Sequence, residues 1–443
     1  WLKPWTTMVV AAVPAATLKP PSEPADGVQV TFELSDEAGY ERFFHENGYV
    51  VVSGVLTDDE VEAIVNEIWT SKSLLGAWPH ISREDPASWD DSVENAALSW
   101  PVGSRNFLDP QAPCNGSDCK ASWNARISPR VQAVFQVLWR RLQRGEACGP
   151  DSDGLPPVVS EAEGTLIASI DRFGLMRPTK LSEQTNGQPS RRERSDWRTS
   201  SNWLHWDQNP WTNPNFFAVQ GLLALTEGTS SSGGFVTVPG FHQEFSAWAE
   251  RNPEGSIRGR SATDVPFPVP LADVEVQSRR QKILVPRGGL LVWDSRMPHE
   301  NFPNGDGTFR MVQYITYKRL APSEVQVRAE AWRTLLATGL VPPSFVQQFS
   351  REGLAALSLA TTEEEMEALE ASMQVAAQLS DDQHAAAKKF RRAFRLKQTA
   401  CLPEELLEVQ TLLRESVATN PKLKEVAAKV KAAEAAYHPF WVL

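Results

Sequence analysis

The stretch NWLHWDQNPW at 202–211 constrains this chain most, because it holds a histidine and an aspartate two residues apart. On an extended backbone such side chains point to the same face, so His205 and Asp207 can reach one metal ion. A second histidine, His299, lies 92 residues after Asp207 (207 to 299) and shortly after the strand-like run GGLLVW at 288–293. We therefore expect these three side chains to converge.

Two histidines and one carboxylate form a facial triad, which suits non-haem Fe(II) and leaves three coordination positions open. Arg310 follows His299 by 11 residues (299 to 310) and begins a run in which Val312 and Tyr314 share its face. An arginine on an apolar wall is costly without an anion, and a carboxylate of 2-oxoglutarate can supply a two-pronged partner. The pattern predicts an iron-dependent oxygenase that uses 2-oxoglutarate and O2.

A rival ligand pair is His242 with Glu244, which lies 55 residues before His299 (244 to 299). This pair opens a predicted helix at 241–251, where side chains two residues apart diverge by about 200°. We therefore expect His242 to pack in the strand-to-helix turn. The remaining histidines have no partner at metal-ligand spacing and are expected to be structural or on the surface: His45, His80, His384 and His438.

The first part of the chain predicts helices that begin at recognisable caps. Ser35 is the expected N-cap of a helix at 34–47, and Thr57 with Glu60 forms a capping box for a helix that ends at Trp69. A buried strand at 49–52 lies between them, and an amphipathic helix follows at 129–144. The irregular, Trp-rich segment 71–129 is expected to form a pocket wall or lid.

The middle of the chain predicts short strands at 164–170, 216–226, 235–238, 281–285, 289–293 and 309–317. Short strands split by glycine and proline turns favour a sandwich or barrel, such as the cupin-like jelly roll. The polar segment 172–201, with basic residues at 191–194, is expected to be a solvated loop. The alternative is a flap that contacts an anionic substrate.

After Pro322 the composition becomes helical, which predicts helices at 329–336, 363–379, 382–396, 403–417 and 421–437. The basic segment 388–397 is expected to be a solvated helix face, with a membrane surface or an acidic partner as the alternative. We thus expect three parts: a flexible leader at 1–33, an oxygenase domain at 34–320 and a helical C-terminal extension at 321–443.

Composition narrows the partners and the compartment. A net charge of -11 and a pI near 5.3 argue against a nucleic-acid partner, and no apolar run reaches the roughly 20 residues of a transmembrane helix. The four cysteines form no CxxC pair, which argues against a zinc ribbon and favours free thiols. We expect a cytoplasmic protein acting on a small molecule. An organellar location is the alternative, because no acid precedes Glu23 and the start is similar to a transit peptide.

Four segments carry a family resemblance: FFHENGYVVVSGVL at 43–56, HWD at 205–207, GGFVTVPGFH at 233–242, and WDSRMPH at 293–299 followed by Arg310. In order and spacing, from about residue 38 to 320, the chain resembles the phytanoyl-CoA dioxygenase-like branch of the Fe(II)/2-oxoglutarate-dependent oxygenases. The resemblance implies an α+β fold with a double-stranded β-helix (jelly-roll, cupin-like) core and flanking helices.

The resemblance also implies roles by position. His205, Asp207 and His299 would bind Fe(II), Arg310 would bind 2-oxoglutarate, and Asn301 would assist. The aspartate separates the chain from halogenase relatives, which leave that ligand position to chloride. The expected reaction is hydroxylation of a C–H bond of a small-molecule metabolite, with release of succinate and CO2. Alternatives are desaturation or ring closure at the same centre, or a non-catalytic jelly-roll scaffold whose helical tail binds a partner.

Overall fold

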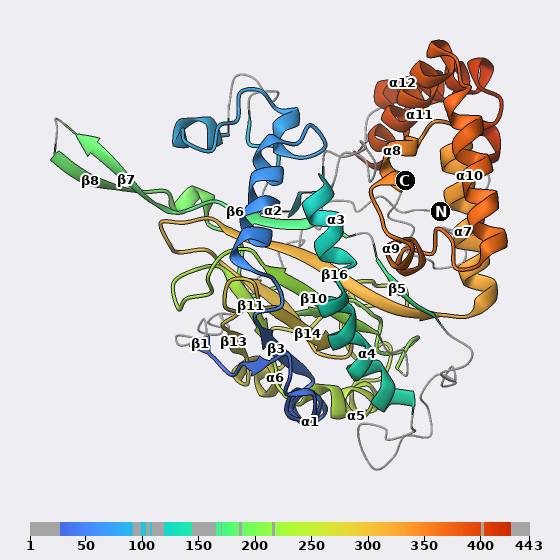
Figure 1. Ribbon diagram of the computed structural model, residues 1–443. Helices are drawn as coiled ribbons and strands as arrows, with labels where there is room; N and C mark the ends of the chain where they lie inside the picture. The colour runs from blue at the N-terminus through green and yellow to red at the C-terminus, as the bar shows by residue number, and fades with distance from the viewer. Residues whose placement is uncertain are drawn as a thin grey trace. The chain divides into compact units, whose positions relative to one another are not determined.

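The protein is described here by a computed structural model that covers residues 27–91, 99–102, 107–108, 119–143, 165–169, 171–185, 188–214, 218–399 and 403–426. The chain divides into two compact units (Figure 1). One takes in residues 121–319 together with the described residues before 109, and the other takes in residues 119–120 and the described residues from Leu320 onward. The leader expected at 1–33 lies mostly outside the described residues, but its end forms two short strands.

The first unit is mixed α+β and contains an eight-stranded sheet in the order β2-β3-β14-β10-β16-β6-β4, with β5 beside β16. Its strands are β2 (Phe32–Glu33), β3 (Tyr49–Ser53), β4 (Phe107–Leu108), β5 (Thr165–Ala168), β6 (Phe173–Met176), β10 (Val219–Ala224), β14 (Leu290–Asp294) and β16 (Arg310–Leu320). The central strands β14, β10, β16 and β6 pair antiparallel.

A six-stranded sheet has the order β1-β13-β11-β15-β9-β12. Its strands are β1 (Gly27–Val28), β9 (His205–Trp206), β11 (Gly234–Thr237), β12 (Phe267–Pro268), β13 (Gln281–Ile283) and β15 (His299–Phe302). The strand β9 is short, and its register with β15 pairs His205 directly with His299. The strands expected at 164–170, 216–226, 235–238, 281–285, 289–293 and 309–317 all form, with ends shifted by a few residues.

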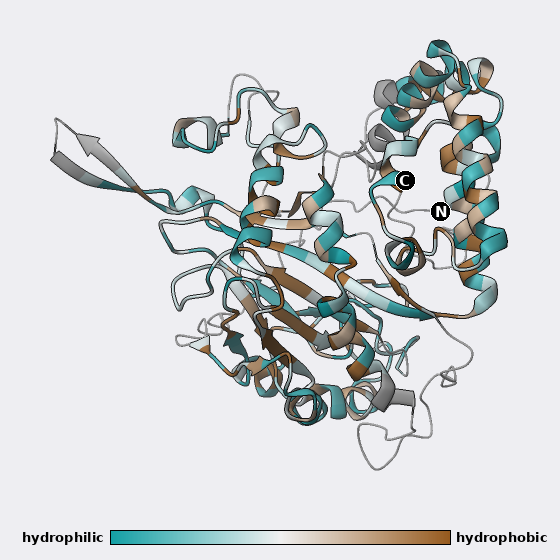
Figure 2. Ribbon diagram, viewed as in Figure 1, coloured by the Kyte–Doolittle hydropathy of each residue, from teal (hydrophilic) through white to brown (hydrophobic). Residues whose placement is uncertain are grey.

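The two sheets share one apolar core. Leu222, Leu291 and Val312 come from the eight-stranded sheet, Phe235 and Ile283 come from the six-stranded sheet, and all five are buried in one cluster. These side chains follow the period of two that makes one strand face apolar. Each buried side chain of this size contributes about 1.5–3 kcal/mol. The strands are accordingly the most hydrophobic part of the ribbon (Figure 2).

Helices cover the outer face of the eight-stranded sheet. The helix α1 (Glu37–Asn47) packs on β3, and α4 (Pro129–Gln143) packs on β10, where a Cβ atom added to Gly221 would lie 3.2 Å from Phe135. The capping box of Thr57 and Glu60 forms as predicted at α2 (Asp58–Thr70). The predicted cap of α1 is wrong by one residue, because Asp36 accepts the hydrogen bond from the Gly39 amide. Shorter helices are α3 (Lys120–Arg126), α5 (Phe245–Arg251) and α6 (Val274–Ser278).

The prediction of a loop at 172–201 is wrong. The segment contains β6 and a hairpin of β7 (Lys180–Thr185) and β8 (Gln188–Glu193), which projects from the sheets (Figure 1). The hairpin pairs through its backbone and is built largely from polar residues, so the sequence shows no apolar alternation there. The last residue of the basic run, Arg194, is buried and bonds Asp90 and Asp196.

The second unit is helical. It contains α7 (Pro322–Ala337), α8 (Pro343–Gln347), α9 (Arg351–Ala356), α10 (Glu363–Ala377), α11 (Asp381–Thr399) and α12 (Pro403–Thr419). Two exposed ion pairs join α11 to α12, Lys389 with Glu415 at 3.0 Å and Arg392 with Glu408 at 2.7 Å. These pairs place part of the basic segment on a solvated helix face. The predicted helix at 421–437 lies mostly outside the described residues.

The structure also describes the helices that could be compared with a membrane span and one of the cysteines. Among the described residues, no helix combines the length and apolar character needed to cross a membrane. Of the four cysteines, Cys119 alone falls in the described part of the chain, where it is buried and takes no part in a disulfide.

Candidate active site

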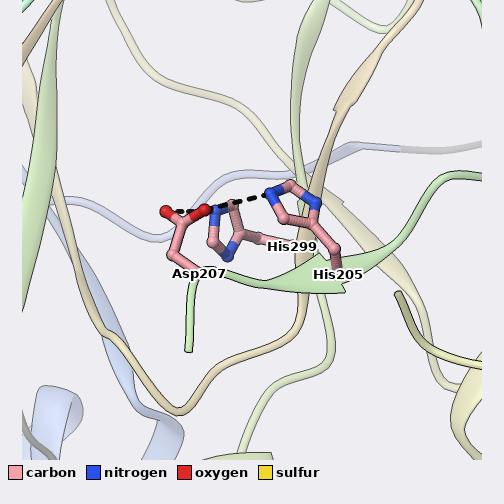
Figure 3. A group of neighbouring side chains, drawn as sticks. All are labelled: His205, Asp207 and His299. Atoms are coloured by element: carbon pink, nitrogen blue, oxygen red, sulfur yellow. Dashed lines mark ion pairs between the residues drawn. The ribbon is translucent and has the colours of Figure 1, made fainter. Parts of the chain in front are cut away.

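The structure brings His205, Asp207 and His299 together between the sheets (Figure 3). His205 begins β9, Asp207 follows directly after that strand, and His299 begins β15. The Nε2 atom of His205 lies 3.3 Å from one carboxylate oxygen of Asp207, and the Nε2 atom of His299 lies 3.6 Å from the other. The convergence expected from the sequence is therefore present in the fold.

Both imidazoles are oriented by the backbone. His205 Nδ1 lies 3.3 Å from the Trp203 carbonyl oxygen, and His299 Nδ1 lies 3.1 Å from the Met297 carbonyl oxygen. A carbonyl oxygen only accepts hydrogen bonds, so each Nδ1 atom donates one, and each Nε2 atom faces the Asp207 carboxylate.

The Asp207 carboxylate is kept ionised by its neighbours. Burial raises its pKa, but the hydrogen bonds and charges of His205 and His299 outweigh that effect and hold the pKa well below its usual value. Gln220 on β10 also donates a hydrogen bond from Nε2 to Asp207 Oδ2 at 2.8 Å. Gln220 was not among the predicted site residues; its inward direction follows only from its place two residues before Leu222 on the same strand face.

These residues fit a metal ion. The three ligand atoms all lie within 4.8 Å of one another, and the two His–Asp separations of 3.3 and 3.6 Å are close to the roughly 3 Å between neighbouring ligands that lie about 2.1 Å from one ion. The Asp207 side chain is 44% exposed, so one side of the group stays open. Two imidazoles and one carboxylate on one face are the donor set that suits ferrous iron with open positions.

Arg310 begins β16 and points into the space between the sheets. Its side chain is buried, and its Nη1 atom has no hydrogen-bond partner among the described residues. A Cβ atom added to Gly174 on β6 would lie 3.0 Å from that nitrogen, so the glycine leaves room beside the guanidinium. A buried cation without a partner is costly. The Arg310 guanidinium is therefore a candidate partner for an anion.

A second cation, Lys282, lines the same cavity as Arg310. Its Nζ atom already donates to the carbonyl oxygens of Ser230 and Ser232 at 2.8 and 2.6 Å and lies over the Phe302 ring. Arg310 is thus the cation in this cavity with an uncommitted donor.

Asn301 lies on the same face of β15 as His299, as expected from its position two residues later. Its Oδ1 atom accepts a hydrogen bond from the Tyr314 hydroxyl at 3.1 Å. Because Tyr314 also shares the inward face of β16 with Arg310, Asn301 connects the two sheets between the metal-ligand group and the cavity.

The rival pair does not assemble. His242 is buried, with its Nε2 atom 3.0 Å from the His45 carbonyl oxygen, and burial lowers its pKa. Glu244 points elsewhere and forms a two-pronged ion pair with Arg279. His242 therefore packs in the turn, as expected.

Aromatic rings surround the two histidines. The Trp203 ring stacks on His205 with centroids 4.8 Å apart, and Phe235 stacks on His299 at 5.8 Å. Trp293 lies 5.3 Å from His299 and is also buried. These rings exclude water from the inner side of the site and leave access on the side of Asp207.

Comparison with known proteins gives one related sequence. A curated protein of Dictyostelium discoideum, named "Putative phytanoyl-CoA dioxygenase", is 20% identical to this chain over 305 residues, which cover 62% of this chain and 73% of that protein. No family model matches the chain. The sequence relative confirms the resemblance to the phytanoyl-CoA dioxygenase-like branch that the motifs indicated.

Solved structures also give distant matches. GIG2 (DUF1479) from Candida albicans is 14% identical, with 86% of this chain and 88% of that chain covered and a TM-score of 0.41. The epimerase SnoN, in complex with Fe3+, alpha ketoglutarate and nogalamycin RO, is 15% identical, with 64% and 83% covered and a TM-score of 0.36.

Proposed function

We propose that this protein is an Fe(II)- and 2-oxoglutarate-dependent dioxygenase that oxidises a C–H bond of a small-molecule metabolite. The observation that carries the proposal is one juxtaposition. Three metal-ligand atoms lie within 4.8 Å of one another, and Asn301, two residues after His299, bonds Tyr314 on the strand face that also carries Arg310, whose buried Nη1 atom has no partner among the described residues. A metal site alone fits many reactions, but the added buried cation favours a co-substrate with a carboxylate.

The residues of the site would divide the work as follows. His205, Asp207 and His299 would hold the iron through Nε2, a carboxylate oxygen and Nε2, and Arg310 would bind the distal carboxylate of 2-oxoglutarate. With both bound, the centre uses O2 to convert 2-oxoglutarate to succinate and CO2 while one oxygen atom enters the substrate. The chain itself supplies orientation and excludes water.

The order of the strands supports a double-stranded β-helix around this site. Taken along the chain, β6, β10, β14 and β16 belong to the eight-stranded sheet, while β9, β11, β13 and β15 belong to the six-stranded sheet. From β9 to β16, successive strands therefore cross from one sheet to the other at every step except from β11 through β12 to β13, which all lie in the six-stranded sheet. Two facing sheets built by such crossings are the arrangement of a jelly roll.

Loss of one ligand tests the proposal. We expect Asp207→Ala to weaken Fe(II) binding by more than about a hundredfold, since loss of an outer partner alone costs 10–100-fold. Succinate formation from 2-oxoglutarate should fall to background. Iron content and succinate would be measured for the wild-type protein, with metabolite extracts added to find compounds that accelerate turnover.

The matched control is Glu244→Ala, which removes the carboxylate of the rival pair. It should bind iron as the wild type does, because Glu244 pairs with Arg279 away from the site. Iron binding that survives in Asp207→Ala and fails in Glu244→Ala would overturn the assignment. A wild-type protein that binds iron without forming succinate would favour the non-catalytic scaffold.

A further inference from the structure

A buried ion pair lies behind the proposed metal ligands, on the opposite face of β15. The Glu300 carboxylate and the Arg280 guanidinium are 2.8 Å apart, and their side chains are only 3% and 2% exposed. Two charges removed from water lose solvation that their attraction often fails to recover, so an apolar pair of similar size would be as stable or more so. This pair therefore calls for an explanation other than stability.

The second oxygen of Glu300 shows what the pair holds. Glu300 Oε2 accepts a hydrogen bond from the backbone amide of Trp203 at 2.7 Å. A carboxylate that accepts from a backbone N–H forms a short, charge-assisted bond, which fixes the peptide more firmly than a neutral partner does. The ion pair thus fastens the segment just before β9 to β15.

Arg280 fastens the preceding residue as well. Its Nη1 atom donates to Asn202 Oδ1 at 3.0 Å, and Asn202 has a φ of 62°. This left-handed backbone is uncommon outside glycine, although asparagine tolerates it better than most residues. The side chain of Asn202 is therefore held while its backbone turns sharply into Trp203.

Trp203 in turn contacts His205 twice. Its carbonyl oxygen faces His205 Nδ1 at 3.3 Å, and its indole ring stacks on the imidazole at an angle of 18°. The carbonyl selects the tautomer that presents Nε2, and the stacked ring limits rotation of the imidazole. A shift of Trp203 would alter both the protonated nitrogen and the direction of the lone pair.

From these contacts we propose that Glu300, held by Arg280, is a positioning residue for the metal site. It acts through the Trp203 peptide to set the tautomer and orientation of His205 before any metal binds. The inference rests on the proposed function only in taking His205 as a ligand. It assigns a role to a residue adjacent to His299 that points away from the site.

The experiment compares metal affinity rather than turnover. Apo protein would be titrated with Co(II), followed by the visible absorption of the bound ion and by calorimetry. The variant Glu300→Asp has a side chain shorter by one methylene, so its carboxylate no longer reaches the Trp203 amide. Its negative charge still lies near Arg280. We expect Co(II) affinity about tenfold lower, in the range typical for loss of an outer partner of a ligand. The absorption bands should also shift, because the geometry around the ion changes.

A double variant, Glu300→Leu with Arg280→Leu, removes the contact without leaving a buried charge. We expect its affinity to fall by about 10–100-fold while its circular dichroism stays that of the wild type. The matched control is Glu244→Asp, which shortens the carboxylate of the half-exposed pair with Arg279 and should leave Co(II) binding unchanged.

The outcomes separate the two proposals. If the wild type binds Co(II) and the folded Glu300 variants bind it equally tightly with unchanged bands, the positioning role is wrong and the metal site stands. If the wild type itself does not bind Co(II), the proposed function fails. Should the double variant not fold, Glu300→Asp alone decides the question.

Discussion

A single glycine, Gly174, shows how little space lies beside the Arg310 guanidinium. A Cβ atom at Gly174 would lie 2.9 Å from Val312 and 3.0 Å from Arg310 Nη1. Both distances are shorter than ordinary contacts, so even the smallest side chain would displace the guanidinium or fill the space beside it. Position 174 requires glycine because neighbouring side chains approach it closely, and its backbone conformation would accept other residues.

We therefore expect Gly174→Ala to raise the KM for 2-oxoglutarate by about tenfold, equivalent to about 1.4 kcal/mol of lost binding. Iron affinity should stay unchanged, because Gly174 does not touch the ligands. Steady-state succinate formation at varied 2-oxoglutarate would measure the effect.

The control is Gly221→Ala on β10. Its added Cβ atom would lie 2.8 Å from the Leu291 carbonyl oxygen, but on the face covered by Phe135. It should lower the melting temperature without changing the KM. A KM that rises equally in both variants would show a general loss of packing and contradict the role of Gly174.

At this scale the sequence predicts the ligands but not their supports. His205 and Asp207 are two residues apart, and their chemistry is specific enough to be recognised locally. Gln220, Glu300 and Gly174 act through contacts with residues more than ten positions away or on other strands. Their roles depend on strand register, which one sequence does not reveal.

At the scale of elements, the turn between β14 and β15 delivers His299 and is itself held by a buried ion pair. Asp294 accepts hydrogen bonds from the Arg296 amide, Nε and Nη2 at 2.8, 3.0 and 2.6 Å. Arg296 then offers its carbonyl oxygen to the Trp206 indole at 3.0 Å. The turn is thus fixed to the strand that carries the other histidine.

Asp294→Asn should lower the free energy of unfolding by about 3–5 kcal/mol at pH 7, because it removes the Asp294 charge that pairs with the buried Arg296. Burial raises the pKa of Asp294, but Arg296 lowers it further, so the net pKa in the folded state is depressed. The contribution is therefore complete above the unfolded pKa of about 3.9 and is lost as the pH falls through the lower folded value.

Urea unfolding of wild type and variant between pH 7 and pH 3 would show this as a gap that is constant down to about pH 4 and narrows below it. Asp196→Asn is the control, since Asp196 is 61% exposed in its pair with Arg194 and should change stability little. A gap that widens in acid would contradict the depressed pKa.

The elements that the sequence predicted well are those with local signals. The capping box at Thr57 fixes the start of α2, and the apolar stripe of α4 gives its length. The hairpin β7–β8 was missed because its polar residues carry no hydrophobic period, and β9 is too short to have one. These segments form strands because their backbones pair with a neighbouring segment, and the sequence of the strand itself does not indicate that pairing.

At the scale of the whole molecule, the site lies entirely within residues 121–319. Every side chain proposed to bind metal or 2-oxoglutarate belongs to this unit, while the helices after Leu320 form the other. The composition of the sequence changes near Pro322, close to where this unit ends. The sequence does not indicate what these helices do, because their apolar spacing is that of any helix that packs against a neighbour.

We expect a chain of residues 18–319 to fold and to bind Co(II) with an affinity within about threefold of the full chain, as independent domains do. Circular dichroism, thermal unfolding and Co(II) titration would test this, with Asp207→Ala in the same short chain as the reference for absent binding. A short chain that unfolds or loses Co(II) would show that the helices are needed to build the site.

The pairing of His205 with His299 in the register of β9 and β15 has one more consequence. The cross-strand contact at this end of the six-stranded sheet is made by the same two residues that would grip the ion. An ion bound there would link β9 to β15 across the sheet. Metal binding and the local order of these two strands would then be coupled. A chelator that removes the ion would abolish activity and also weaken the pairing of β9 with β15.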